Sequence, residues 1–149
     1  MKNEGETMKR FVCVFLILCL LPVCAFAVDL DEFNIFASVI GAPELDSATA
    51  QNVNGYSRFI QGDCSIIFSE KDGKSNIFVQ GSGDEFLAYC CAAIHVFDLN
   101  GNTTSNHGQL LTMYFLAHTE TEHQTGQTSN GYFFFIEPRE AGYMFMIGD

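Results

Sequence analysis

The sequence predicts an α+β fold, a two-layer sandwich in which helices pack on one face of a four-stranded antiparallel sheet. Two pairs of apolar runs are each separated by turn residues, as in β-hairpins. Three other segments repeat apolar residues at helical spacing, or are apolar and follow a helix cap. The resulting order is α-β-β-α-α-β-β, and such a chain buries its apolar sides most simply by stacking the helices on one side of a single sheet.

Residues 1–27 are expected to be a cleaved signal peptide, and residues 28–149 a single domain. Basic residues up to Arg10 precede an apolar run with the length of a signal-peptide core, which is too short for a comfortable membrane span. Ala25 and Ala27 supply the small residues that a signal peptidase requires. Cleavage after Ala27 and export from the cytoplasm are therefore predicted.

The positions of the cysteines bear on two features of the exported chain, a lipid anchor and a disulfide. A lipid anchor at Cys24 is not favoured, because Val23 stands where a lipobox has a small residue. Three cysteines remain after the leader, which is few for an exported protein and permits at most one bridge. A disulfide between Cys64 and Cys90 is compatible with the expected packing, and Cys91 would then stay free.

The net charge argues against two classes of anionic partner. Three of the seven basic residues and two of the eighteen acidic residues fall in the leader, so residues 28–149 carry four and sixteen, a net charge of −12. Such a surface repels nucleic acid phosphates and anionic lipid headgroups. No nucleic acid partner, no membrane span and no cofactor are expected.

The first helix is predicted directly after the leader. Its apolar residues recur three and four positions apart: Phe33, Phe36, Ala37 and Ile40. Asp29 or Asp31 can cap its start, and Gly41 with Pro43 ends it. The following residues 46–55 are expected to be a polar connector.

The first hairpin spans residues 55–83. Asp72 and Gly73 form a strong two-residue turn signal, which pairs Phe68 with Ile77. Alternation along both strands then assigns six residues to one face: Ile60, Cys64, Ile66, Phe68, Ile77 and Val79.

Two helices are predicted to follow, over residues 84–98 and about 107–119. Asp84 is expected to cap the first of them. The second contains an apolar run whose periodicity fits a buried helix or a buried strand. Asn106 and Gln109 have the spacing of a helix cap and its third residue, which favours the helix. Residues 118–131 are expected to be a polar loop.

The last hairpin leads to the main functional hypothesis. Its strands, joined at residues 138–142, are apolar on both faces, whereas the helices can cover only one. The uncovered face would present four side chains to a partner: Phe133, Phe135, Met144 and Met146. The alternative is that another segment covers them. The chain is therefore predicted to be a small exported acidic binding protein without catalytic activity, with a protein or a small apolar ligand as its partner.

A second hypothesis is a small exported hydrolase or metal-dependent enzyme. The segment HTETEH offers imidazole and carboxylate groups of the kind that bind Zn²⁺: His118, Glu120, Glu122 and His123. Cys91 and His95 are four residues apart on a predicted helix, so a thiolate and its base could touch there. Side chains of one straight helix run parallel rather than converge, and buried cysteines usually serve packing.

Overall fold

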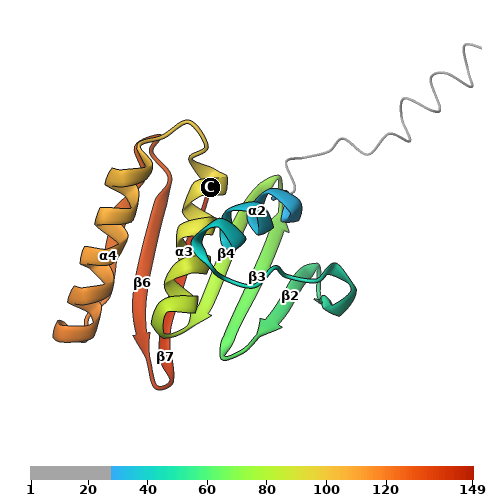
Figure 1. Ribbon diagram of the computed structural model, residues 1–149, viewed down its shortest axis with the longest axis horizontal. Coiled ribbons are helices and arrows are strands. Elements are labelled where there is room, and N and C mark those ends of the chain that lie inside the picture. Colours follow the sequence, from blue (N-terminus) through green and yellow to red (C-terminus); the bar gives the residue numbers. More distant parts are fainter. Residues whose placement is uncertain (1–27) are drawn as a thin grey trace, which may run out of the picture.

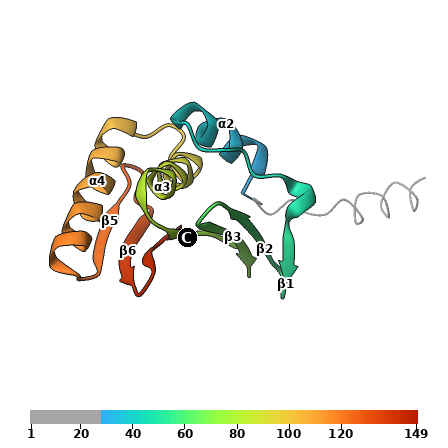
Figure 2. The ribbon, with the colours of Figure 1, turned by 60° about the horizontal axis from the view of Figure 1, so that its bottom comes forward.

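The structure is a computed structural model that describes residues 28–149, and the predicted leader lies outside the described residues. Within this range three α-helices lie on one side of a single antiparallel sheet (Figures 1 and 2). The helices are α2 (Leu30–Ile40), α3 (Gly83–Phe97) and α4 (Thr103–Glu120), with a short 3₁₀ turn η1 (Ser47–Thr49). The strands are β1 (Gln51–Val53), β2 (Tyr56–Gln61), β3 (Cys64–Lys71), β4 (Lys74–Gly81), β5 (Gln124–Gln127), β6 (Phe133–Arg139) and β7 (Gly142–Gly148).

The sheet has seven strands in the order β1-β2-β3-β4-β7-β6-β5. The α+β class is consistent with the prediction, but the four-stranded sheet is wrong. The four expected strands are β3, β4, β7 and β6, which lie next to one another. Two strands are added beside β3 and one beside β6, and each of them pairs antiparallel with its neighbour.

The two extra strands beside β3 are β1 and β2, and they are formed by two tight turns that the sequence prediction did not include. Asn54 and Gly55 both have positive φ, which is the geometry of a two-residue hairpin turn, and they join β1 to β2. Gly62 also has positive φ and turns the chain between β2 and β3. This second turn shifts the alternation, so Ile60 pairs with Ser65 and is 55% exposed. Its predicted place on the covered face was therefore wrong.

The register of the β3–β4 hairpin was predicted correctly. Phe68 pairs with Ile77, and Ile66 pairs with Val79. The row continues across the sheet, because Val79 pairs with Phe145. The side chains on this covered face form the floor of the core: Phe59, Cys64, Ile66, Ile77, Val79, Phe134, Ile136, Phe145 and Ile147 are all buried.

Helix α2 begins and ends where the sequence indicates. The Asp29 carboxylate accepts a hydrogen bond of 2.9 Å from the backbone N–H of Asp31, and Gly41 closes the helix in the left-handed conformation. Phe33 and Ala37 are buried against α3, whereas Ile40, which was predicted for the same face, is exposed. The helix therefore packs mainly on another helix.

Helix α3 lies over the centre of the sheet (Figure 2). Eight of its fifteen residues are buried, and the Tyr89 hydroxyl donates a hydrogen bond of 2.8 Å to the carbonyl of Pro43. Its N-cap residue is Ser82, so the capping role predicted for Asp84 was wrong. With one side on the sheet and another on α2, the helix is the centre of the core, as its apolar sequence indicated.

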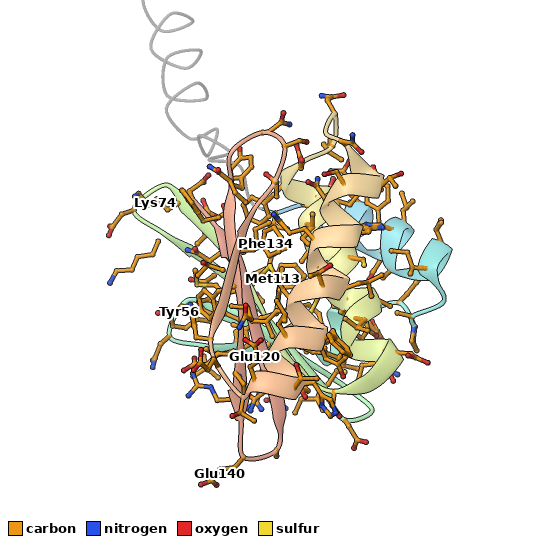
Figure 3. The ribbon with its side chains drawn as sticks, turned by 90° about the vertical axis from the view of Figure 1, so that its left-hand side faces the viewer. Tyr56, Lys74, Met113, Glu120, Phe134 and Glu140 are labelled. Carbon is orange, nitrogen blue, oxygen red and sulfur yellow. The ribbon has the colours of Figure 1, made fainter. Side chains whose placement is uncertain are left out.

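Helix α4 confirms the choice of helix over strand, although it begins earlier than predicted. Its N-cap is Asn102, whose side chain accepts a 3.0 Å hydrogen bond from the N–H of Ser105. Asn106 is therefore inside the helix and is not its cap. Met113 lies on the side of α4 that faces the sheet and Phe134 (Figure 3). Strand β5 runs beneath this helix, in a segment that was predicted to be a loop.

Candidate binding surface

The face of the sheet that points away from the helices is uncovered within the described residues. Figure 3 views the sheet from the side, with α4 and Met113 on one side and Tyr56 and Lys74 directed away from the helices. Two adjacent phenylalanines show the contrast between the faces. Phe134 points to the helices and is 1% exposed, whereas Phe133 points outward and is 67% exposed. We call this uncovered side the outer face.

A continuous apolar row crosses the outer face. The residues in register on four neighbouring strands, β3, β4, β7 and β6, are Ile67, Phe78, Met146 and Phe135. Met144 and Phe133 lie on the adjacent rows, and Phe133 is the most exposed of the set. The outer apolar patch is defined here as Ile67, Phe78, Phe133, Phe135, Met144 and Met146.

The four patch residues predicted from the sequence all lie on this face. Phe133 and Phe135 come from β6, and Met144 and Met146 from β7. Ile67 and Phe78 were missed. The same alternation that placed Ile66 on the covered face would have assigned both residues to the opposite one, so the signal for them was present.

Polar contacts border the patch. The Arg139 guanidinium donates to the Glu137 carboxylate at 2.7 Å and to the sulfur of Met144 at 3.6 Å. At the β2 end, Arg58 Nε donates to the Ser65 hydroxyl at 2.9 Å. Arg139 thus contacts one patch residue, and Arg58 lies on the strand next to Ile67.

The His123 ring marks the β5 side of the patch. It packs on Phe135, with 5.0 Å between the ring centroids. The apolar row of the outer face therefore extends from Ile67 on β3 to the His123 ring beside β5.

Charge is distributed unequally between the two layers. Residues 28–50 and 82–123, which form the helices and their loops, contain ten acidic and no Lys or Arg residues. The strands and their turns contain six acidic residues and all four basic ones. The basic residues stand at positions of the outer face: Arg58, Lys71, Lys74 and Arg139. The helical layer thus carries most of the negative charge, and the outer face carries little.

The residues predicted as metal ligands do not form a cluster. The Nδ1 atom of His118 is hydrogen-bonded to the Tyr143 hydroxyl at 2.7 Å, and Glu120 ends α4. Glu122 and His123 lie beyond Thr121, a residue in the left-handed conformation, and His123 turns to Phe135 on the other side of the sheet. Among residues 28–149, no three His, Cys, Asp or Glu side chains come together as ligands for a metal ion.

The Cys91–His95 pair lacks the properties of a catalytic site. Cys91 is buried, and burial raises the pKa of its thiol from 9.0 to about 11, so the reactive thiolate is scarce at neutral pH. The His95 ring packs on Phe36, with 3.7 Å between the centroids. The His95 ring therefore packs between α3 and α2, and Cys91 is a buried core residue.

The three cysteines in the described residues are free thiols, so the disulfide considered between Cys64 and Cys90 is not formed. Burial, together with the negative charge of Glu85, raises the pKa of Cys64 to about 11. Burial also raises the pKa of Cys90 well above its usual value, and Cys91 and Cys64 add to the effect. These thiols behave as small apolar core residues.

Comparisons with protein-family models, with curated proteins and with solved structures find no match to this chain. No helix in residues 28–149 combines the length and the apolar character needed to cross a membrane.

Proposed function

We propose that this is a small exported acidic binding protein, without catalytic activity, that recognises its partner through the outer face of the sheet. One observation supports this proposal: the helices cover one side of the sheet, while the other carries the outer apolar patch, in which Phe133 is exposed and the other five residues are half-buried. Contiguous exposed apolar patches of more than a few hundred Å² are uncommon on soluble monomers and usually mark interaction sites.

The composition of the patch suits recognition. Phenylalanine offers a large rigid apolar surface, and methionine adapts its shape to a partner through several rotatable bonds. Covering apolar surface stabilises a complex by about 25 cal/mol per Å², before the cost of association is subtracted. A protein surface or a small apolar ligand therefore fits the outer face better than a charged molecule does.

A fluorescent apolar probe tests the proposal with a matched pair of variants. The probe is 8-anilinonaphthalene-1-sulfonate, which becomes fluorescent when it binds apolar surface. Phe133→Glu places a charge on the outer face, and Phe115→Glu places the same charge on the solvent side of α4. The two phenylalanines are 67% and 64% exposed, so neither change should disturb the core.

The expected result is saturable probe binding to the dilute folded protein, at least several-fold weaker in Phe133→Glu and unchanged in Phe115→Glu. Far-UV circular dichroism checks that both variants are folded. Absence of probe binding, or an equal effect of the two substitutions, would reject the outer face as the binding site.

Export is part of the same proposal and has its own test. The chain is expressed with its native leader in a secreting host, and the mass and N-terminal sequence of the released protein are determined. Cleavage after Ala27 gives a chain that begins at Val28. A protein retained in the cytoplasm with an intact leader, or one carrying lipid on Cys24, would contradict this part of the proposal.

A further inference from the structure

Two uncovered surfaces compete as the place where a large partner docks. One is the outer face, and the other is the solvent side of α4, where Leu111 and Phe115 are exposed four residues apart. The solvent side of α2, where Ile35 and Val39 are exposed, belongs to a helix of only 11 residues and is smaller than either. The two competing surfaces differ in size. Seven strands at about 4.8 Å spacing and about 3.3 Å per residue make the outer face about 30 Å by 23 Å, or about 700 Å² before side-chain relief.

The solvent side of α4 is much smaller. Eighteen residues at about 1.5 Å each give a stripe about 27 Å long and about 10 Å wide, or about 270 Å². A stable protein interface buries about 800 Å² on each partner. Because such interfaces range from about 600 to 1,000 Å² per partner, the outer face is large enough and the α4 stripe is not.

The distribution of charge indicates which partner can use the outer face. Pairing two copies through their helical layers would bring ten acidic residues against ten more. Pairing through the outer faces instead leaves the two helical layers on opposite sides of the assembly. They would be about 30 Å apart, allowing about 10 Å between each pair of layers, whereas charges are screened beyond about 8 Å at physiological salt.

Within the outer face, the basic side chains lie around the apolar row: Lys71 and Lys74 flank the turn between β3 and β4, and Arg58 on β2 adjoins Ile67. Glu137 is the acidic side chain that the strands direct outward, and Arg139 neutralises it. The apolar row from Ile67 to Phe135 lies between these groups and Arg58, so the row can pack on its own copy.

We infer that the partner of the outer face is a second copy of this chain, packed sheet against sheet about a twofold axis. This inference rests on the proposed function and names its partner. The two outer faces would form the inside of a β-sandwich about 10 Å thick, with Phe78 and Met146 near its centre.

The arrangement closes on itself. In a twofold dimer both outer faces are covered, and no further copy can add. Packing of the outer face of one copy on the helical layer of another is a head-to-tail contact, and such contacts build closed rings or open filaments of more than two copies. The inference is therefore of a dimer and not of a larger assembly.

Sedimentation equilibrium of the purified exported protein, over a wide range of concentration, measures the association. The expected species are monomer and dimer only, and added NaCl should not dissociate the dimer because the contact is apolar. Met146→Glu should weaken dimerisation at least about thirty-fold, as removal of a central interface residue does. Phe115→Glu should leave the dissociation constant unchanged.

Phe133→Glu supplies a second disruptive variant at a site too exposed to be needed for folding. A monomer at all concentrations would overturn the inference, as would a dimer that Met146→Glu and Phe133→Glu both leave intact. Filaments would overturn it as well.

The probe experiment separates this failure from failure of the proposed function. A monomeric protein that still binds the probe at Phe133 would keep the outer face as a binding site and remove the second copy as its partner. A monomer whose outer face binds no probe would remove both. If the dimer is present, probe binding per chain should fall as the protein concentration rises through the dissociation constant.

Discussion

The hydroxyl of Ser129 donates a 2.6 Å hydrogen bond to the carboxylate of Asp98, thirty-one residues earlier in the chain. The same carboxylate oxygen accepts bonds from the backbone N–H of Ser129, at 3.1 Å, and from the side-chain amide of Asn106. Asp98 is 1% exposed. It therefore ties the end of α3 and the start of α4 to the turn before β6, and its role is structural.

Asp98→Ala should lower the free energy of unfolding by about 2–4 kcal/mol, because three donors lose their partner in a buried place. Urea denaturation measures the loss, and Asp31→Ala, at an exposed position in the first turn of α2, is the control. A loss below about 0.5 kcal/mol would show that water or another group replaces the carboxylate.

The stabilisation that the Asp98 carboxylate contributes should depend on pH in a defined direction. Burial alone would raise the pKa of Asp98, but the hydrogen bonds from Ser129 and Asn106 outweigh it and lower the pKa below 3.8. The stabilisation is therefore present above about pH 4 and is lost as the pH falls through the lower folded value. Unfolding free energies of wild type and Asp98→Ala should converge in strong acid, and a constant difference would contradict this.

His107 should make the protein less stable in mild acid. Burial lowers its pKa from 6.5, nearby His95 adds to the effect, and its Nε2 atom is buried without a hydrogen-bond partner. As the pH falls below about 6.5 the unfolded chain binds a proton that the folded chain resists, so the free energy of unfolding decreases. His107→Gln should reduce this slope between pH 7 and 5; equal slopes for the two proteins would refute the assignment.

The thiols should be inert in the folded protein. At pH 8, iodoacetamide should leave Cys64, Cys90 and Cys91 unmodified in the native state and label all three in guanidinium chloride, because their raised pKa values and burial suppress the thiolate. Mass spectrometry counts the labels. Rapid native labelling of Cys91 would restore the hypothesis that it acts with His95.

Two glycines should respond in opposite directions to alanine. A Cβ on Gly126 would lie 2.6 Å from the Met113 sulfur and 2.8 Å from Phe134, so Gly126→Ala should destabilise by about 1–3 kcal/mol through overpacking. Gly108 lies within α4 with open space around it, and Gly108→Ala should stabilise by about 0.5–1 kcal/mol. Thermal unfolding measures both, and effects of the same sign would mean that α4 and β5 are not packed as described.

The elements predicted best were those whose signals are local. The turn at Asp72 and Gly73 determined the register of β3 with β4, because a two-residue turn leaves one pairing. Strand β5 could not be found in this way. Its sequence, QTGQ, has no apolar alternation, and it is a strand because it pairs with β6.

Other errors have equally specific causes. Asn106 has the spacing of a helix cap, but its amide is drawn to Asp98 in the interior, a contact that sequence spacing does not show. The turn at Asn54 and Gly55 was overlooked because the residues before it are polar, so the strand they form did not stand out. The face of Ile60 was misassigned because the turn at Gly62 interrupts the alternation.

The candidate site followed from a simple geometric argument. A hairpin that is apolar on both faces cannot be covered twice by helices on one side of the sheet, and Phe133 with Met146 lie on the open side. The width of the patch was not predicted, because it depends on β7 pairing with β4. That pairing sets Phe78 beside Met146, although the two residues belong to different hairpins.

Methionine oxidation of the unmodified protein tests the central claim most directly. Met144 and Met146 lie on the outer face, whereas Met113 is buried on the sheet-facing side of α4 and serves as an internal reference. Brief exposure to dilute hydrogen peroxide, followed by peptide mass spectrometry, gives the oxidation rate of each residue. In dilute protein, Met144 and Met146 should oxidise faster than Met113, and saturating apolar probe or high protein concentration should slow them several-fold. Rates for Met144 and Met146 that stay unchanged when probe or a second copy is bound would show that binding occurs elsewhere, and would contradict the account.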